Sequence, residues 1–166
     1  MKKSITKSVR QTQKLGHRFA KEILALGPGK SAAVLGLQGD LGAGKTTFLQ
    51  GFARGLGLKD IVNSPTFVIM RRFTIYDLRF KNLYHIDCYR IHSAKEMLNL
   101  GFEEIIKNPK NIVAIEWPEN IKKILPKSSI LITFKHLDST TRGLTIKKEK
   151  YMLQWQYGTA KKINHH

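Results

Sequence analysis

The stretch that decides the fold is Gly39-Asp40-Leu41-Gly42-Ala43-Gly44-Lys45-Thr46, which fits the pattern G-x-x-x-x-G-K-[ST]. The glycines let the main chain curl so that successive N–H groups point inward at a phosphate. Lys45 supplies a positive charge for the β- and γ-phosphates, and the Thr46 hydroxyl is placed to bind Mg²⁺. The pattern therefore predicts a site for ATP with Mg²⁺. Its predicted nucleotide contacts are Asp40, Leu41, Gly42, Ala43, Gly44, Lys45, Thr46 and Thr47.

The residues on either side of this stretch support the prediction. The apolar run 32–37 before it reads as a buried strand, and residues 45–56 after it place Leu49, Phe52 and Leu56 on one helical face. A strand, a glycine-rich turn and a helix are the arrangement that phosphate binding by a P-loop requires. The alternative, a plain glycine turn beside a surface lysine, would not need this order.

The remaining elements alternate between strands and helices. Residues 8–26 form an amphipathic helix with capping-box spacing at Ser8 and Gln11, and Gly101 interrupts a helix over 93–106. A strand over 66–75 pairs with 82–89 as a hairpin; further strands are expected at 112–116, 129–135 and 144–148, and a helix at 118–125. The pattern predicts an α/β P-loop NTPase fold with a mixed, mostly parallel sheet flanked by helices. We expect one domain over 1–150 and a loosely ordered basic tail over 151–166.

The charge balance is strongly positive. Twenty-nine Lys and Arg residues face 12 Asp and Glu residues, a formal net charge of +17. Such an excess attracts phosphate-rich or acidic partners, with RNA as the obvious candidate. An organism whose proteins are all rich in lysine would give a similar net charge without any RNA partner. The sequence also shows no arginine-rich block and no RNA-binding motif. The charge alone leaves both interpretations open.

Several features favour a cytoplasmic location. Cys88 is the single cysteine, which fits a reducing compartment. The basic start at residues 1–7 is not followed by the apolar region of a signal peptide. No apolar run approaches the roughly 20 residues that span a bilayer. We expect no membrane partner.

Two acids are candidates to complete the site. Glu116 ends the apolar strand 112–115, and Asp87 ends the run Leu83–Ile86. Ligands of α/β sheets bind at the carboxyl ends of the strands, so either acid can hold Mg²⁺ or orient a nucleophile there. The simpler alternatives are a water-facing acid for Glu116 and pairing with Arg90 for Asp87.

Two further features are weaker. His85 lies two residues from Asp87 and shares its strand face, although a lone histidine is more often a packed or hydrogen-bonded residue than a catalyst. Ser64-Pro65-Thr66 enters the predicted strand at 66–75, and its hydroxyls could sense a γ-phosphate as a switch does.

Taken in order, these pieces resemble the bacterial TsaE (YjeE) ATPases of tRNA threonylcarbamoyladenosine synthesis. The resemblance spans about residues 8–148. It rests on Thr12-Gln13-Lys14-Leu15-Gly16, the P-loop through Thr47, Asn63-Ser64-Pro65-Thr66-Phe67, Tyr84-His85-Ile86-Asp87-Cys88-Tyr89-Arg90, Gly101-Phe102-Glu103-Glu104 and Val113-Ala114-Ile115-Glu116-Trp117-Pro118.

The resemblance implies a role that composition does not reach. Family members hydrolyse ATP slowly alone and act with TsaD, which transfers threonylcarbamoyl to adenosine 37 of ANN-reading tRNAs, and with TsaB. Hydrolysis would reset the complex with TsaD and TsaB between turnovers, and the chain would contact tRNA only indirectly, through that complex. The resemblance carries Mg²⁺ ligation to Thr46 and Glu116, a phosphate-clamp role to Lys45, and switch-like roles to Ser64, Pro65, Thr66 and the Asp87 segment. We take Glu116, Asp87 and Lys45 as the catalytic candidates. The resemblance also places adenine-pocket residues near Ser8 and Arg142.

Two other functions remain compatible with the sequence. Small-molecule kinases use the same phosphate turn, but they need an arginine-bearing lid, for which Arg71, Arg72 and Arg90 are the midchain candidates. An RNA-binding module whose nucleotide site only regulates affinity would show steeply salt-dependent tRNA binding. Phosphate release from ATP without an added acceptor would favour the ATPase.

Overall fold

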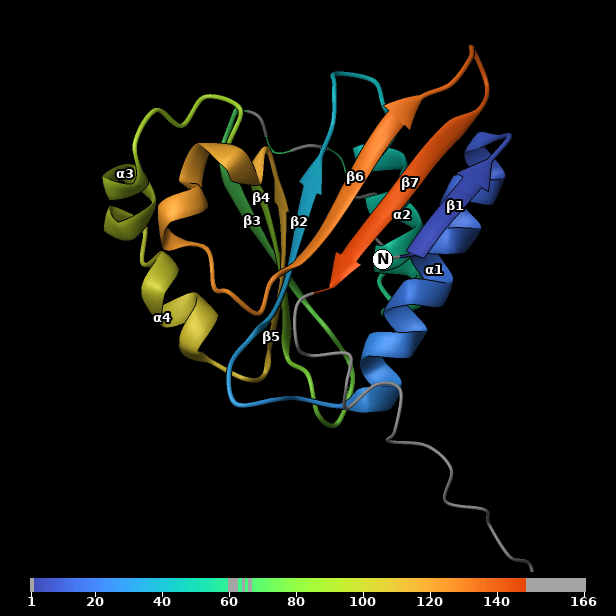
Figure 1. Cartoon of the computed structure of the whole chain (residues 1–166). Coiled ribbons are helices and arrows are strands. Elements are labelled where there is room, and N and C mark those ends of the chain that lie inside the picture. The colour runs from blue at the N-terminus through green and yellow to red at the C-terminus, as the bar shows by residue number, and fades with distance from the viewer. Residues whose placement is uncertain (1, 60–62, 64, 66, 149–166) are drawn as a thin grey trace, which may run out of the picture.

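A seven-stranded sheet with helices on both faces forms the molecule (Figure 1). The computed structural model describes residues 2–59, 63, 65 and 67–148. The strands are β1 (Lys2–Thr6), β2 (Ala33–Gln38), β3 (Met70–Thr74), β4 (Asn82–Asp87), β5 (Asn111–Glu116), β6 (Ile130–His136) and β7 (Arg142–Lys148). The helices are α1 (Val9–Leu26), α2 (Lys45–Gly55), α3 (Ala94–Asn99), α4 (Phe102–Lys107) and the 3₁₀ helix η1 (Pro118–Ile124).

The spatial order of the strands is β1-β7-β6-β2-β5-β4-β3. The four inner strands β6, β2, β5 and β4 run parallel, whereas β3, β7 and β1 pair antiparallel at the two sides. β5 is buried at all its positions because helices cover both faces of the sheet, as is usual for parallel strands. The predicted mixed α/β P-loop fold is confirmed, including the hairpin of β3 with β4.

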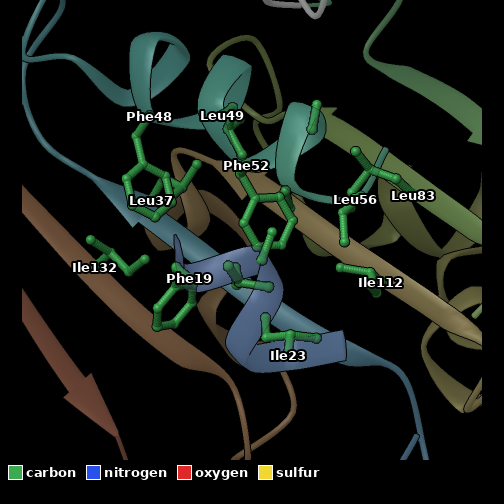
Figure 2. Close-up of a cluster of buried hydrophobic side chains, with 14 of the residues drawn as sticks. Phe19, Ile23, Leu37, Phe48, Leu49, Phe52, Leu56, Leu83, Ile112 and Ile132 are labelled. Atoms are coloured by element: carbon green, nitrogen blue, oxygen red, sulfur yellow. The ribbon is translucent and has the colours of Figure 1, made fainter. Parts of the chain in front are cut away.

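Each face of the sheet has its own hydrophobic core. Successive residues of a strand point to opposite faces, so Leu35 and Leu37 of β2 pack toward α1 and α2 while Val34 packs toward α3, α4 and η1. Figure 2 shows the first core, where Phe19 of α1 meets Phe48 and Phe52 of α2. Helix α2 directly follows the phosphate turn. Its packing against both the sheet and α1 therefore holds it in place.

Glycines allow α1 and α2 to approach until their backbones touch. A Cβ added to Gly51 would lie 1.9 Å from the carbonyl oxygen of Gln13, and one added to Gly16 would lie 2.2 Å from that of Phe48. Contacts this short are not tolerated by any side chain at these positions. The approach holds the first turn of α2, and with it the phosphate turn, in a fixed place.

Helix boundaries follow the expected capping signals, with one difference. Ser8 caps α1 by accepting a hydrogen bond from the backbone N–H of Gln11 at 3.2 Å, and Gly101 separates α3 from α4. The segment predicted as a helix over 118–125 is instead the kinked 3₁₀ helix η1, with Ile121 at φ −123°. Trp117, in the left-handed conformation at φ 58°, turns the chain out of β5, and the non-helical conformation of Ile121 divides the segment into two short turns.

Two further differences concern the chain ends and β3. The short strand β1 was not predicted, because Lys2-Lys3-Ser4-Ile5-Thr6 lacks a clear apolar alternation. β3 begins at Met70 rather than at 66, since Ile69 adopts φ 61° and Val68 closes a turn onto Pro65. The predicted tail over 151–166 lies outside the described residues. No helix in the part of the chain that the structure describes is long and apolar enough to cross a membrane.

We expect Gly51→Ala to destabilise the fold. In an ordinary helix interior this change would stabilise by about 1 kcal/mol. Here the added Cβ must displace the backbone of α1, and overpacking of this kind costs about 1–3 kcal/mol. Urea unfolding measures the difference. Gly143→Ala is the matched control, because its Cβ would meet only Leu137 atoms at ordinary contact distance; equal stability of both variants would contradict the close helix contact.

Candidate nucleotide-binding site

The phosphate turn joins the end of β2 to the start of α2. Gly39, Gly42 and Gly44 have φ values of 140°, 77° and 102°, which L-residues with side chains rarely adopt. Gly39 also lies against β6, since an added Cβ would be 2.5 Å from the carbonyl oxygen of Phe134. The turn thus curls around the N-terminus of α2, whose backbone N–H groups and dipole favour an anion.

Lys45 lies inside this curl. Its side chain is 4% exposed, and Nζ donates hydrogen bonds to the carbonyl oxygens of Gly39 and of Asp40, the latter at 2.9 Å. Nζ also lies 4.3 Å from the centre of the Trp117 ring, a cation–π distance. Burial lowers the pKa of Lys45 from its usual range, and nearby carboxylates, Glu116 first among them, oppose that shift.

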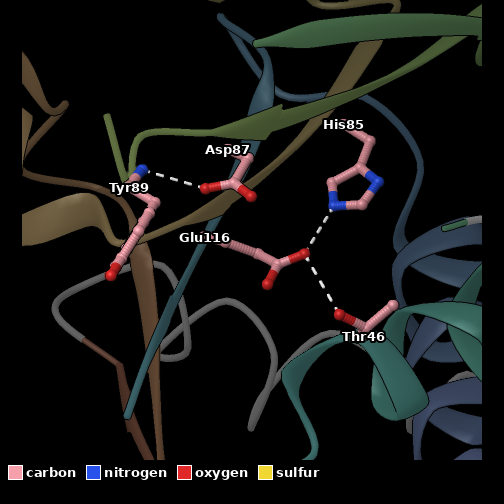
Figure 3. Close-up of polar contacts among 5 residues, drawn as sticks. All are labelled: Thr46, His85, Asp87, Tyr89 and Glu116. Carbon is pink, nitrogen blue, oxygen red and sulfur yellow. Dashed lines mark hydrogen bonds and ion pairs between the residues drawn. The ribbon is translucent and has the colours of Figure 1, made fainter. Parts of the chain in front are cut away.

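The two predicted acids lie side by side at the carboxyl ends of parallel strands (Figure 3). Asp87 ends β4, Glu116 ends β5, and the two residues are direct partners in the sheet register. Both are almost fully buried, at 4% and 3% exposure. Asp87 accepts a hydrogen bond from the backbone N–H of Tyr89 at 2.9 Å, which fixes the turn after β4.

Glu116 is held by two contacts on the same oxygen, Oε1. His85 Nε2 lies 2.8 Å from it, and Thr46 Oγ1 lies 3.5 Å away (Figure 3). His85 is fully buried, and its other ring nitrogen, Nδ1, has no hydrogen-bond partner among the described residues. Because a carboxylate only accepts hydrogen bonds, His85 donates from Nε2. Glu116 Oε2 has neither of these two partners.

A cavity of about 250 Å³ lies where the turn and the acids meet. It brings together the P-loop and both acids, with the rings of Tyr89 and Trp117, 5.2 Å apart, forming a wall. Its lining residues are Leu41, Gly42, Gly44, Lys45, Thr46, Thr47, Asp87, Tyr89, Glu116 and Trp117. Six of the eight predicted residues of the phosphate turn therefore line one cavity together with the two acids, whereas Asp40 and Ala43 are not among the lining residues.

The two residues expected near the adenine differ in their surroundings. Arg142 lies directly against the phosphate turn, since a Cβ on Gly44 would fall 2.7 Å from its Cδ. Its Nε is buried and has no partner within the described part of the chain. Ser8 uses its hydroxyl to cap α1, and the α1 residue next to Gly44 is Thr12, whose Cγ2 would lie 3.9 Å from that Cβ.

Three further residues contact or line the site: His85, Tyr89 and Trp117. His85 is buried and hydrogen-bonded, as expected of a lone histidine, and its partner is the predicted acid Glu116. Trp117 directly follows Glu116, and Tyr89 lies two residues after Asp87. Both line the cavity, and their place just after a strand-end acid is the sequence signal that could have pointed to them. Of the predicted switch, Pro65 is buried and its carbonyl accepts from Val68 N–H at 2.9 Å; Ser64 and Thr66 lie outside the described residues.

The phosphate turn on a parallel α/β sheet, with acids at neighbouring strand ends, defines a nucleotide-binding protein of the P-loop NTPase class. The sequence profile of the family described as "Threonylcarbamoyl adenosine biosynthesis protein TsaE" matches residues 6–144. The chain belongs to the TsaE family.

Individual relatives agree with this assignment. The tRNA threonylcarbamoyladenosine biosynthesis protein TsaE of Bacillus subtilis is 41% identical over 116 residues, 70% of each chain. The protein of the same name from Rickettsia typhi is 36% identical over 149 residues, 89% of this chain and 96% of that one. The crystal structure of Bacillus subtilis YdiB superposes with a TM-score of 0.68 at 31% identity, covering 89% of this chain and 84% of that chain.

Proposed function

We propose that this chain binds ATP with Mg²⁺ and hydrolyses it, as an accessory protein of the cytoplasmic modification that forms N6-threonylcarbamoyladenosine in tRNA. The observation that carries the proposal is the convergence of the phosphate turn, Lys45 and two buried carboxylates on one cavity. The phosphate turn alone would be enough to bind a nucleotide. Hydrolysis also needs groups that hold Mg²⁺ and orient the attacking water, and the two acids across the cavity can supply them.

Lys45 and the turn would hold the phosphates. The ammonium now bonds to carbonyls of its own turn, so triphosphate binding exchanges those acceptors for charged oxygens. Hydrogen bonds to charged groups are worth about 1.5–3 kcal/mol each. The backbone N–H groups of residues 40–47 and the start of α2 would add to this, as the sequence predicted. A bound phosphate would also offset the burial that lowers the pKa of Lys45.

The oxygen atoms around the cavity suit Mg²⁺. Thr46 offers a hydroxyl and Glu116 a carboxylate, with Asp87 beside them, and hard oxygen ligands are those that Mg²⁺ prefers. Among the described residues, no group of three or more His, Cys, Asp or Glu side chains is arranged as a metal cage. This fits Mg²⁺ held by one or two protein oxygens together with phosphates and water. When bound, Mg²⁺ would neutralise charge that develops on the phosphates.

His85 would act as a positioning residue for Glu116. Its donated hydrogen bond at 2.8 Å fixes one carboxylate oxygen, so the other can face the metal or orient the attacking water. Partners that orient a metal-binding carboxylate in this way are a recurring feature of metal sites. Asp87, held by the Tyr89 N–H, would orient water from the neighbouring strand.

The remaining predicted residues lie around the cavity and would contact the nucleotide or respond to it. Arg142, whose buried Nε lies beside the phosphate turn, would contact the nucleotide, and Ser8 would contribute through the turn that it caps. Ser64, Pro65 and Thr66 would act as a switch that responds to the γ-phosphate. Partner proteins of the TsaD and TsaB type would read that state, and tRNA would be met through them.

Glu116→Gln should retain most nucleotide affinity and lower the rate of phosphate release about 100-fold. The change removes one negative charge without changing the shape, and this charge matters most as the phosphoryl group moves. Mant-ATP binding and single-turnover phosphate release, with and without TsaD and TsaB, measure the two effects. Glu104→Gln, on the exposed face of α4, is the matched control because Glu104 is not among the carboxylates that act on Lys45; a full rate in the Glu116 variant would show that another group orients the reaction.

His85→Leu should lower turnover about 10-fold and raise the Mg²⁺ concentration needed for half-maximal ATP affinity. His85→Gln should restore a good part of both, because its amide N–H can still donate to Glu116. A purely structural role predicts a different result, since both variants would then change thermal stability while leaving the Mg²⁺ dependence of binding intact.

A further inference from the structure

The outer face of α1 carries an uninterrupted row of cations. Arg10, Lys14, Arg18 and Lys21 lie within about 100° of the helix circumference, opposite the stripe buried against the sheet. Neighbours in this row are three or four residues apart, so a cation recurs about every 5–6 Å along roughly 16 Å of helix. The one acid of α1, Glu22, lies beyond the last of them and pairs with Arg18 at 3.9 Å.

This row belongs to one side of the molecule only. On the face covered by α1 and α2, exposed Arg54 of α2 adds to the row, and Glu22 is the sole acid of the two helices. On the opposite face, visible on the other side of the sheet in Figure 1, α3, α4 and η1 carry as many acids as lysines. The positive charge is therefore concentrated on the α1–α2 side among these helices.

Two hollows flank the row. One of about 490 Å³ lies between α1 and α2 and is lined by Arg10, Lys14 and Arg54 among others. The other, of about 630 Å³, lies between β1 and α1 and is lined by Lys14, Arg18 and Lys21 among others. Among the described residues that line either hollow there is no carboxylate and no Phe, Tyr or Trp.

One of the cations is held in position. Arg54 Nη1 donates to Gln13 Oε1 at 3.3 Å, and Gln13 Nε2 in turn donates to Gln50 Oε1 at 3.1 Å. These two hydrogen bonds hold the guanidinium at the edge of the first hollow, which Gln13 also lines. An arginine oriented in this way loses less freedom when it binds a phosphate than a free surface lysine does.

We propose that this basic face, Arg10, Lys14, Arg18, Lys21 and Arg54, binds the phosphate backbone of RNA directly. A strand of nucleic acid carries one negative charge per nucleotide, so a regular row of cations beside two hollows whose described lining residues include no carboxylate is complementary to it. Backbone contacts of this kind position RNA without reading its sequence. The inference goes beyond the proposed function, in which tRNA is met through partner proteins, and it does not depend on ATP hydrolysis.

The test is a titration of the isolated full chain into fluorescently labelled mixed tRNA, followed by anisotropy at several salt concentrations. Lys14→Ala/Arg54→Ala should weaken binding about 10-fold at low salt. It should also reduce the slope of log affinity against log salt concentration by about 1.5–2, because each of the two substitutions removes one phosphate contact. Lys122→Ala/Lys123→Ala on η1 removes the same charge from the opposite face and should change affinity less than 2-fold.

Three results would overturn the proposal. Equal weakening in both double variants would mean that the overall charge, not this face, attracts RNA. Unchanged binding in the α1–α2 variant would place the contact elsewhere. Equally tight, equally sensitive binding of poly-glutamate would show a general surface for acidic chains, including acidic proteins. Mant-ATP affinity measured on the same variants should stay at the wild-type value, so the outcome is independent of the nucleotide site.

Discussion

A lysine ammonium buried at the N-terminus of a helix constrains everything around it. Lys45 is nearly excluded from water, and its charge is accommodated by two carbonyls of its own turn, a tryptophan face and a group of carboxylates. An unpaired charge in such a place costs several kcal/mol. The glycines that curl the turn and the acids at the strand ends are therefore needed by the fold as well as by any ligand.

The close packing of α1 on α2 keeps this arrangement in place. Gly16 and Gly51 bring the two helices together until backbone meets backbone, and α2 carries Lys45 and Thr46 in its first turn. On the other side of the cavity, the parallel pairing of β4 with β5 sets Asp87 opposite Glu116. The helix contact thus sets the position of the turn, and the strand register sets the position of the acids.

Much of this could be predicted from the sequence because the relevant signals are local. The phosphate turn, its helix and the strand ends at Asp87 and Glu116 follow from short-range patterns, and family resemblance placed them in order. Features that depend on long-range contacts were less visible. His85 and Glu116 are 31 residues apart in the sequence, so their contact can be predicted only when the register of β4 against β5 is known. The short strand β1 forms by pairing with β7, at the far end of the described chain, and its own residues carry no clear strand pattern.

In the proposed function, one cavity holds MgATP through the phosphate turn and the buried acids. Calorimetric titration of MgATP into the wild-type chain and into Lys45→Ala tests it most directly, with the exposed Lys30→Ala as a control. Loss of the buried ammonium should weaken affinity about 10- to 100-fold, the worth of one or two charged hydrogen bonds, and Lys30→Ala should bind like the wild type. Equal affinity in all three proteins would contradict the account.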